Sequence, residues 1–477
     1  MQLPHVEWSL PYLISEWTVR IAMLVYVPQK RSPSAARAWL LLIFFLPLPG
    51  VLLYALVGRI YIPKRRIALQ RQASRLIRSV QTRLPPLLVS NAVTLPASVQ
   101  AAVQLAAGLG DFVATRGNAI EILPGYERPI ECLIDDLQAA RESIHLLYYI
   151  FENDATGQRV ADVLIGAAGR GVRCRVLMDA VGSRSALREI APRLRAAGIE
   201  VHALLPVGLF RRNVARFDLR NHRKIVVIDA NIAYTGSQNI VDAEFIPGLP
   251  NEELVVRIEG PVVTQLQYVF LADWYFETNQ IPATDEILHE HTSQGDTIAQ
   301  VLPSGPGYGR ENTKELMISL IYAARSEVII ATPYFVPDEP FLEAVIAAAR
   351  RGIRMRLILP LRSNQRVTHW AQQSYYAQLL AAGVEIHLFE KGFLHAKHMT
   401  MDGEVALIGS TNMDIRSFAL NAEVSLLAYG PEFAARLNKV SQGYIEGGRT
   451  LDAATWSRRP LVRRLLQNVA RLADSLL

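Results

Sequence analysis

"RNHRKIVVID", residues 220–229, contains His222, Lys224 and Asp229 in a stretch whose other residues predict a buried β-strand. The spacing of the three polar residues is His-x-Lys-x4-Asp. The same spacing recurs in "HAKHMTMD", residues 395–402. One such pattern can arise by chance, but two copies in one chain indicate two related halves.

The two copies also share the residues that follow them. The second copy consists of His395, Lys397 and Asp402. After six intervening residues, each aspartate is followed by Gly-Ser-x-Asn, which contributes Ser237 and Asn239 in the first copy and Ser410 and Asn412 in the second. Both asparagines stand 17 residues after their histidines, and this shared offset is a further argument against chance.

The repetition extends well beyond the motifs. The parallel segments are AARESIHLLYYIF (139–151) and AARSEVIIATPYF (323–335), RGVRCRVLM (170–178) and RGIRMRLIL (351–359), and NEELVVRIEG (251–260) and NAEVSLLAYG (421–430). The last pair carries Glu253 and Glu423 at matching positions. The offsets, between 170 and 184 residues, are too long for a solenoid repeat and indicate a duplicated domain.

Within each half, the hydrophobic pattern alternates strand and helix. In the first half it predicts strands at 143–151, 172–180 and 199–206, and helices at 157–171 and 186–198. Each motif opens a segment that predicts two strands joined by a tight turn, at 224–236 and 397–409. The predicted fold class is therefore α/β, with mixed, largely buried sheets flanked by helices. A histidine and a lysine two apart on a strand would share one face.

Apolar segments near the N-terminus predict a membrane anchor. Residues 39–58 contain no charge across 20 positions, which is long enough to cross the hydrocarbon core of a bilayer. Pro47, Pro49 and Gly50 interrupt this segment, so a straight span and a kinked or re-entrant hairpin both fit. The stretch 8–27 is a weaker candidate because it contains Glu16 and Arg20, which are spaced to pair.

Positive charge is concentrated at two flanks of the chain. Residues 59–79 carry seven Lys or Arg and no acid, and residues 457–471 carry five Arg and no acid, although the whole chain has a net charge of only +6. Basic runs beside apolar segments suit an anionic membrane surface, whereas a nucleic-acid binder would spread its basic residues over its body. The tail 457–477 fits either a helix that caps the body or a helix that lies on a membrane.

Other signals for metals, nucleotides and disulfides are weak. His289 and His291 lack ligand-spaced partners and are interpreted as solvated. The glycines of "SGPGYGRENTK", residues 304–314, do not have the order of a nucleotide-binding P-loop. Cys132 and Cys174 are interpreted as small buried thiols. We therefore expect no metal and no cofactor.

The doubled motif suits the chemistry of a phosphodiester. Without a metal, such a reaction needs a nucleophile, a proton donor for the leaving alcohol, and fixed positive charge around the phosphoryl oxygens. One histidine of the pair can attack phosphorus and form a phospho-histidine, while the other protonates the departing oxygen and later takes a proton from the incoming hydroxyl. The sequence does not decide which of His222 and His395 has which role.

The remaining motif residues have supporting roles in this hypothesis. The lysines would hold the phosphoryl oxygens, with the asparagines and serines as neutral donors. Glu253 and Glu423 are candidates to bond the far nitrogen of each histidine and fix its tautomer. Asp229 and Asp402 are counted among the catalytic motif residues, although we suspect a structural role for them.

The paired His-x-Lys-x4-Asp motifs with Gly-Ser-x-Asn resemble the phospholipase D superfamily over about residues 116–445. The segments "SEW" (15–17), "YVPQKRSP" (26–33) and "LPLPG" (46–50) resemble those of bacterial cardiolipin synthases within it. This resemblance implies two tandem phospholipase D-like domains related by a pseudo-twofold axis. It also implies a phosphatidyltransferase that makes cardiolipin and glycerol from two phosphatidylglycerol molecules. By family analogy, His222 would be the nucleophile and His395 the general acid.

The resemblance also assigns the segments of the chain. We expect a membrane anchor at 1–70, a connector at 71–115, the two phospholipase D-like domains at 116–282 and 301–445 with a linker at 283–300, and a basic amphipathic tail at 446–477. The expected location is the bacterial inner membrane, with the catalytic domains in the cytoplasm. The expected partners are phospholipids and the membrane, and not nucleic acid.

Several alternatives stay open at the level of sequence. The arginines among residues 208–220 border the lipid headgroup entrance in one hypothesis and belong to a solvated loop in another. The same catalytic core would also suit a hydrolase, either a phospholipase D or a nuclease. A membrane-bound scaffold that has lost catalysis is a third alternative. The second lipid is phosphatidylglycerol or phosphatidylethanolamine, and the oligomeric state is unknown.

Overall fold

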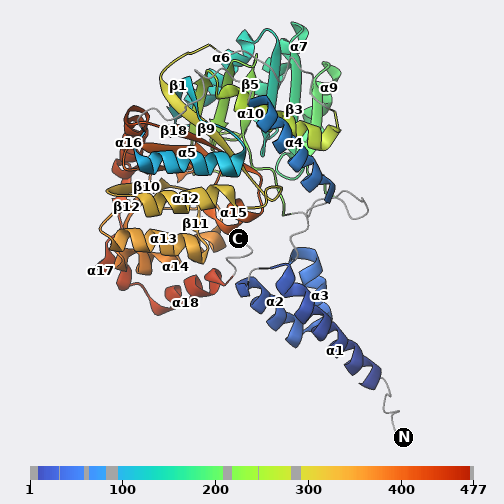
Figure 1. Cartoon of the computed structure of the whole chain (residues 1–477), viewed down its shortest axis with the longest axis vertical. Coiled ribbons are helices and arrows are strands. Elements are labelled where there is room, and N and C mark those ends of the chain that lie inside the picture. Colours follow the sequence, from blue (N-terminus) through green and yellow to red (C-terminus); the bar gives the residue numbers. More distant parts are fainter. Residues whose placement is uncertain are drawn as a thin grey trace. The chain divides into compact units, whose positions relative to one another are not determined.

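The computed structural model describes residues 9–31, 33–58, 64–81, 95–207, 218–244, 246–280 and 292–472. The chain divides into two compact units, an N-terminal unit of residues 1–63 and 209–218 and a larger unit of residues 64–208 and 219–477 (Figure 1). Each unit is described by itself below. The predicted histidines at 289 and 291 and the arginine-rich residues 208–217 lie outside the described residues.

Residues 9–58 of the N-terminal unit, apart from residue 32, which the structure does not describe, form a series of helices. Its elements are α1 (Ser9–Tyr26), η1 (Val27–Gln29), α2 (Pro33–Phe45), α3 (Pro47–Leu53) and the π-helical turn η2 (Tyr54–Gly58). Among the described residues, one helical stretch, Leu10–Gln29, is long and apolar enough to cross a membrane. It holds Glu16 and Arg20, whose side chains form an ion pair of 3.0 Å one turn apart. The segment that looked weaker in sequence thus forms the longer apolar helix.

The segment 39–58 forms a hairpin instead of one straight helix. Helix α2 ends at Phe45, before Pro47, which begins α3. The two helices approach closely at Gly50, where an added Cβ would lie only 2.9 Å from the Cα of Ile43. Val27, Ala36, Ile43 and Tyr54 form the small core of the unit. Of the two alternatives left open by the sequence, the structure adopts the hairpin.

The larger unit is built on one sheet that both halves share. The first half contributes β1 (Thr115–Pro124), β2 (Ser143–Tyr148), β3 (Arg173–Asp179), β4 (Glu200–Leu204), β5 (Ile225–Ile228), β6 (Ile232–Gly236) and β8 (Leu254–Glu259). The second half contributes β9 (Thr297–Ser304), β10 (Glu327–Ala331), β12 (Arg354–Pro360), β13 (Glu385–Phe389), β15 (His398–Met401), β16 (Val405–Gly409), β18 (Glu423–Tyr429) and β19 (Gly448–Thr450).

The strand order shows the internal symmetry. It is β19-β13-β12-β10-β15-β16-β18-β9-β1-β8-β6-β5-β2-β3-β4. The halves meet where β1 and β9 pair antiparallel, with Thr115 opposite Ala299. Outward from this seam, corresponding strands follow in the same order on both sides, and both sides mix parallel and antiparallel pairs. The predicted α/β class with two tandem, pseudo-twofold halves is confirmed.

Helices cover both faces of the sheet (Figure 1). They are α4 (Lys64–Gln81), α5 (Ala97–Gly110), α6 (Glu127–Ala139), α7 (Ala155–Gly169), α8 (Arg184–Glu189), α9 (Ala191–Ala196), α10 (Val263–Thr278), α12 (Asn312–Ala323), α13 (Glu339–Arg350), α14 (Arg366–Ala381), α15 (Ile415–Ala419), α16 (Pro431–Glu446), α17 (Ala453–Ser457) and α18 (Leu461–Arg471). Helices α10 and α16 share a core cluster with strands of both halves. Separate clusters on the other face contain α6 and α7 in the first half, and α12, α13 and α14 in the second.

Strand β5, which follows the first motif, is buried on both faces. Ile225 and Val227 belong to the cluster of α10, and Val226 and Ile228 to the cluster of α6 and α7. This is why the sequence after the motif is a continuous apolar run and does not alternate with polar residues. A strand fixed on both faces holds the residues just before it in a defined position.

Two local predictions need adjustment. The expected helix 186–198 is two short helices, α8 and α9, which meet at Ile190 because Pro192 lies in the first turn of α9. Cys132 is half-buried in α6 and Cys174 is buried in β3, and both are free thiols.

Candidate active site

Short backbone pairings bring each motif beside the other half of the molecule. The two-residue strand β7 (Asn251–Glu252) pairs in parallel with β14 (Phe393–Leu394). At the related position, Asn221 forms an isolated bridge with Ala422. Each pairing places the residue before a motif histidine next to the residue before the glutamate of the opposite half. The histidine of each half therefore lies beside the glutamate of the other half.

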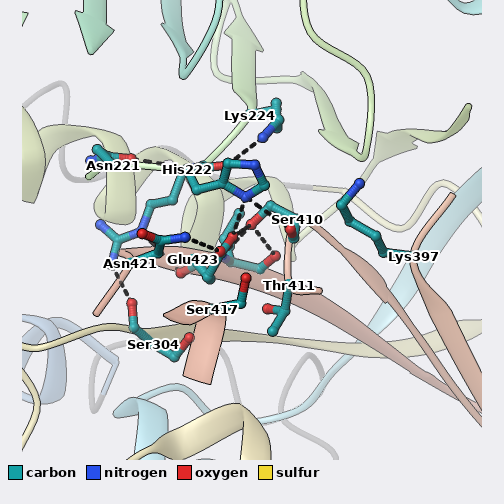
Figure 2. Close-up of polar contacts among 12 residues, drawn as sticks. Asn221, His222, Lys224, Ser304, Lys397, Ser410, Thr411, Ser417, Asn421 and Glu423 are labelled. Atoms are coloured by element: carbon teal, nitrogen blue, oxygen red, sulfur yellow. Dashed lines mark hydrogen bonds and ion pairs between the residues drawn. The ribbon is translucent and has the colours of Figure 1, made fainter. Parts of the chain in front are cut away.

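His222 is held by the second half (Figure 2). Its backbone N–H donates to the carbonyl of Ala422 at 2.8 Å. Its Nδ1 lies 2.9 Å from Oε2 of Glu423 and 3.0 Å from the backbone oxygen of Ser410. A carbonyl oxygen only accepts hydrogen bonds, so Nδ1 carries the proton. Nε2 is then the ring nitrogen available to the cavity described below.

His395 has the mirrored arrangement. Its backbone N–H donates to the carbonyl of Glu252 at 2.8 Å. Its Nδ1 lies 2.8 and 2.9 Å from the two carboxylate oxygens of Glu253. The sequence predicted that Glu253 and Glu423 bond the far nitrogens of the histidines, and the geometry has these contacts. The crossing between halves was not foreseen, because both partners lie far apart in sequence.

The motif serines hold these glutamates. The hydroxyl of Ser237 donates to Glu253 and accepts from the backbone N–H of Leu254 at 2.8 Å. Ser410 does the same for Glu423 and the N–H of Val424, the latter at 3.0 Å. All four side chains are fully buried. The serines thus lie behind the glutamates, in supporting positions instead of at the cavity wall.

The motif lysines lie beneath the histidines. The histidine and lysine of each motif stand in the extended segment just before β5 or β15, and not within the strand as expected. Lys224 Nζ donates to the carbonyl of His222 at 2.7 Å, and Lys397 Nζ donates to that of His395 at 2.6 Å. Each lysine is almost wholly buried. Two ammonium groups are thereby held close to the two imidazoles.

The motif aspartates lie elsewhere, at the far end of the strand. Asp229 accepts hydrogen bonds from the backbone N–H groups of residues 141–143, at 2.7 to 2.9 Å. Asp402 accepts the equivalent bonds from residues 325–327, at 2.8 to 2.9 Å. These residues form the turns that lead into β2 and β10. The structure therefore separates the aspartates from the cluster of histidines, lysines and glutamates.

A cavity of about 340 Å³ joins the two histidines. His222, His395, Asn239 and Asn412 all line it. Asn239 Oδ1 accepts from the backbone N–H of Ile150 at 3.2 Å, which directs its NH₂ group away from that contact. Within the described part of the chain, the buried Oδ1 of Asn412 has no hydrogen-bond partner. The cavity thus combines two imidazoles with two side-chain amides.

The cavity has other residues that the motifs do not contain, and of these the sequence hypothesis included only Arg220, among the arginines of 208–220. These other residues include Tyr149, Arg220, Tyr334, Asp414 and Arg416. Tyr149 packs against the ring of His222, with centroids 4.8 Å apart. Arg220, the last arginine of 208–220, forms a buried ion pair of 3.2 Å with Asp179. Arg220 thus lines the cavity, while the other arginines of that hypothesis lie outside the described residues. The other residues of this group stand at positions where the two halves differ, so a search for repeats cannot find them.

Burial dominates the electrostatics of the site. It lowers the pKa of both histidines, with help from the nearby lysines. The pKa of His222 falls well below its usual value, whereas at His395 the carboxylate of Glu253 opposes the lowering and favours the protonated imidazole. Burial also lowers the pKa of Lys224 to about 7 and that of Lys397 to about 8. Burial alone would raise the pKa of Glu253, but His395, Lys397 and Ser237 outweigh it and lower the pKa to about 2.

The described residues contain no cluster of three or more His, Cys, Asp or Glu side chains that could hold a metal ion.

Comparison with known proteins gives a clear family. The family "Cardiolipin synthase, PLD-like domain" matches residues 133–274 and 317–443, and the family "Phospholipase_D-nuclease N-terminal" matches residues 19–59. The first match covers more than half of the chain and falls once on each half. The chain belongs to the cardiolipin synthase family of the phospholipase D superfamily. This family membership confirms the resemblance seen in the paired motifs.

Individual relatives support this family membership. The chain is 36% identical to cardiolipin synthase A of Pectobacterium carotovorum over 97% of both chains. It is also 36% identical to cardiolipin synthase A of Yersinia pseudotuberculosis, over 96% of this chain and 95% of that one. Among solved structures, phosphatidylserine synthase of Haemophilus influenzae superposes with a TM-score of 0.62 at 15% identity, over 80% of this chain and all of that chain. This last likeness is one of fold.

Proposed function

We propose that this protein is a cardiolipin synthase that transfers a phosphatidyl group from one phosphatidylglycerol to the glycerol hydroxyl of another. By family it is a phosphatidyltransferase. The observation that carries the proposal is the pairing of His222 and His395 at one cavity, each with Nδ1 bonded to a buried glutamate. The arrangement leaves both Nε2 atoms for one phosphodiester, which is what a two-step displacement needs.

The two steps follow from this pairing. In the first, Nε2 of one histidine forms a bond to phosphorus while the bond from phosphorus to the glycerol oxygen breaks. The other histidine gives its Nε2 proton to that oxygen, and glycerol leaves. In the second, this histidine takes the proton from the hydroxyl of a second lipid, whose oxygen bonds phosphorus as the phospho-histidine bond breaks. One phosphodiester replaces another, so the reaction requires no nucleotide.

We assign His222 as the nucleophile and His395 as the proton carrier. Nδ1 of His222 shares its proton with a neutral carbonyl oxygen as well as with Glu423, which suits an imidazole that starts neutral. Nδ1 of His395 faces both oxygens of Glu253, whose low pKa keeps it ionised. A carboxylate in that position stabilises an imidazolium, the form that a general acid needs.

The surrounding groups would bind the phosphoryl oxygens. Lys224 and Lys397 supply positive charge beneath the histidines, and the amides of Asn239 and Asn412 supply neutral donors at the cavity wall. We propose that the helical N-terminal unit anchors these halves to the bacterial inner membrane, on its cytoplasmic side. The segment boundaries expected from the sequence are retained as part of this proposal.

Hydrolysis is the main alternative, because water can replace the second lipid at a phospho-histidine. It would make the protein a phospholipase D, or a nuclease if the donor were a nucleic acid. The second lipid can also be phosphatidylethanolamine. These alternatives differ in their products, so one experiment distinguishes them.

The test is mass spectrometry of products from purified full-length protein and phosphatidylglycerol in detergent micelles, with EDTA and without nucleotide. We expect cardiolipin and glycerol in equal amounts, and neither product from His222→Ala or His395→Ala. Addition of phosphatidylethanolamine with deuterated acyl chains shows whether it also acts as acceptor. Phosphatidic acid as the main product would overturn the synthase assignment in favour of a phospholipase.

A further inference from the structure

The last described helix, α18, has its apolar face turned outward. Its buried residues are Gln467 and Ala470. Its exposed residues include Leu461, Val462, Leu465, Leu466, Val469 and Leu472, whose relative exposures range from 46% to 82%. A surface helix of a globular protein normally buries such a stripe against the core. Here the helix buries a polar and small side instead.

Polar contacts fasten α18 to α14. Gln467 donates to Gln373 at 2.8 Å, and this contact is buried. Gln467 also accepts from Arg459 at 2.9 Å. The guanidinium of Arg471 lies over the ring of Tyr375, 4.5 Å from its centroid. Helix α18 is thus held on α14 without contacts from its exposed leucines and valines. These side chains can therefore contact another surface.

The charge on the helix indicates which surface that is. Residues 457–471 carry five arginines and no acid. Arg458, Arg463 and Arg464 are exposed, whereas Arg459 and Arg471 take part in the contacts above. Self-association through this face would bring six exposed arginines together with no acidic residue from the same segment, which is unfavourable. An anionic lipid surface complements the arginines and accepts the leucines and valines, as in helices that lie in a membrane interface.

Helix α14 connects this face to the catalytic cavity. Gln467 and Arg471 contact Gln373 and Tyr375, so the two helices run in the same direction. The beginning of α18 is therefore at the end of α14 that carries Thr368, a residue of the cavity wall. In Figure 1, α18 lies beside α14. The helix on which α18 packs thus contributes a residue to the cavity wall.

We propose that α18 is an interfacial helix that docks the catalytic halves on an anionic bilayer through its exposed leucines and valines. The helix stays packed on α14 while those side chains enter the boundary between headgroups and acyl chains. The proposal goes beyond the catalytic assignment and does not depend on it, because it concerns where the helix lies and not what reaction occurs.

The experiment measures depth in the bilayer. Full-length protein with Cys132→Ser and Cys174→Ala receives a single cysteine by Leu465→Cys or by Val462→Cys, labelled with an environment-sensitive fluorophore. Lys439→Cys, on the exposed side of α16, is the matched control. Each protein is reconstituted in vesicles of phosphatidylcholine with about one third phosphatidylglycerol, which gives a strongly anionic surface. The vesicles are prepared with or without lipids that carry a quencher on the acyl chain.

We expect blue-shifted emission and at least about twofold quenching by the acyl-chain quencher at positions 465 and 462, and neither at 439. We also expect weaker quenching in vesicles without phosphatidylglycerol. Emission at 465 and 462 equal to that at 439 would overturn the proposal. A blue shift without lipid quenching, together with disulfide cross-linking between copies through Leu465→Cys, would overturn it in favour of self-association. Two positions are used so that misfolding of one variant does not decide the result.

Discussion

Single residues carry two opposite pH effects at this site. Burial lowers the pKa of Lys224 to about 7 and that of Lys397 to about 8. Their positive charge, which the proposed mechanism needs, is lost as the pH rises through this range. We expect kcat/KM for phosphatidylglycerol to fall above about pH 7. A bound phosphate raises the pKa of both lysines, so kcat should fall at a higher pH than kcat/KM.

Stability should change with pH in the other direction, which provides the control. The unfolded lysines have a pKa of about 10.4, so the folded state binds fewer protons than the unfolded state between about pH 7 and 10. The contribution of these two lysines to the free energy of unfolding therefore rises with pH in that window. Steady-state kinetics and Tm measured from pH 6 to about 9 test both trends. A loss of activity that only follows a loss of Tm would contradict the assignment.

A second prediction follows from the contact between each histidine and the glutamate of the other half. Glu253 contacts His395, and Glu423 contacts His222. Glu253→Gln should therefore impair the general acid and Glu423→Gln the nucleophile, each lowering kcat by roughly 10²- to 10⁴-fold with a smaller change in KM. The two variants are expected to differ when the leaving group needs no proton.

A phosphatidyl ester of p-nitrophenol provides that leaving group. We expect Glu253→Gln and His395→Ala to release nitrophenolate in a burst with accumulation of phospho-histidine, and Glu423→Gln and His222→Ala to show no burst. Stopped-flow absorbance and acid-quench labelling measure the two quantities. The reverse pattern would exchange the roles of the two histidines.

At the scale of elements, the motif aspartates act as clamps on turns. Asp229 holds the turn into β2 and Asp402 the turn into β10, each through three backbone N–H groups. We expect Asp229→Ala or Asp402→Ala to destabilise the protein by about 2 to 4 kcal/mol, because backbone donors lose a charged acceptor. Below the new Tm, kcat should stay within about tenfold of the unmodified protein.

Two measurements separate the effects on stability and on catalysis. Thermal unfolding by circular dichroism gives Tm, and activity is assayed at 15 °C, which is about 30 °C or more below a typical mesophilic Tm. Lys224→Met is a useful comparison, since it should lower kcat strongly without a comparable loss of Tm. An aspartate variant with unchanged Tm and a large loss of kcat would show that the carboxylate has a direct catalytic role.

Local patterns predicted most elements of the first half, and for physical reasons. The strands from β2 to β6 are runs of mostly apolar, buried residues, and polar residues and glycines separate them from their neighbours. In α7 the apolar residues recur with a helical period. The predicted helix 186–198 was wrong in its continuity because Pro192 starts a new helix. The segment 39–58 was ambiguous because hydropathy does not distinguish a span from a hairpin that a glycine contact closes.

The site was predictable only in part. The repeat identified the histidines, lysines, serines, asparagines and glutamates, since these types recur at fixed offsets. It did not identify the exchange between halves, because Asn221 and Ala422 pair across 200 residues and no local pattern encodes that contact. Nor did it identify Arg220 or Asp414, which have no counterpart in the other half. Symmetry is thus informative about shared chemistry and silent about what each half adds.

At the scale of the whole molecule, one chain supplies both histidine–glutamate pairs of the cavity. His222 and Glu423 meet within the same chain, as do His395 and Glu253. We expect a mixture of His222→Ala and His395→Ala proteins, co-purified through two tags, to remain inactive. Product analysis as above gives the measurement. Recovery of about a quarter or more of the activity would require halves exchanged between chains and would contradict a site made within one chain.

The seam between β1 and β9 has an evolutionary consequence. Two identical subunits related by a twofold axis would have to place the same residue at both equivalent positions of a shared cavity. Fusion into one gene removes that constraint while the crossed histidine–glutamate pairs keep the halves together. Arg220 faces the cavity where the second half has Phe393, and Asp414 where the first half has Val241. Under the proposed mechanism, covalent linkage would allow the donor lipid and the acceptor lipid to meet walls of different composition at one cavity.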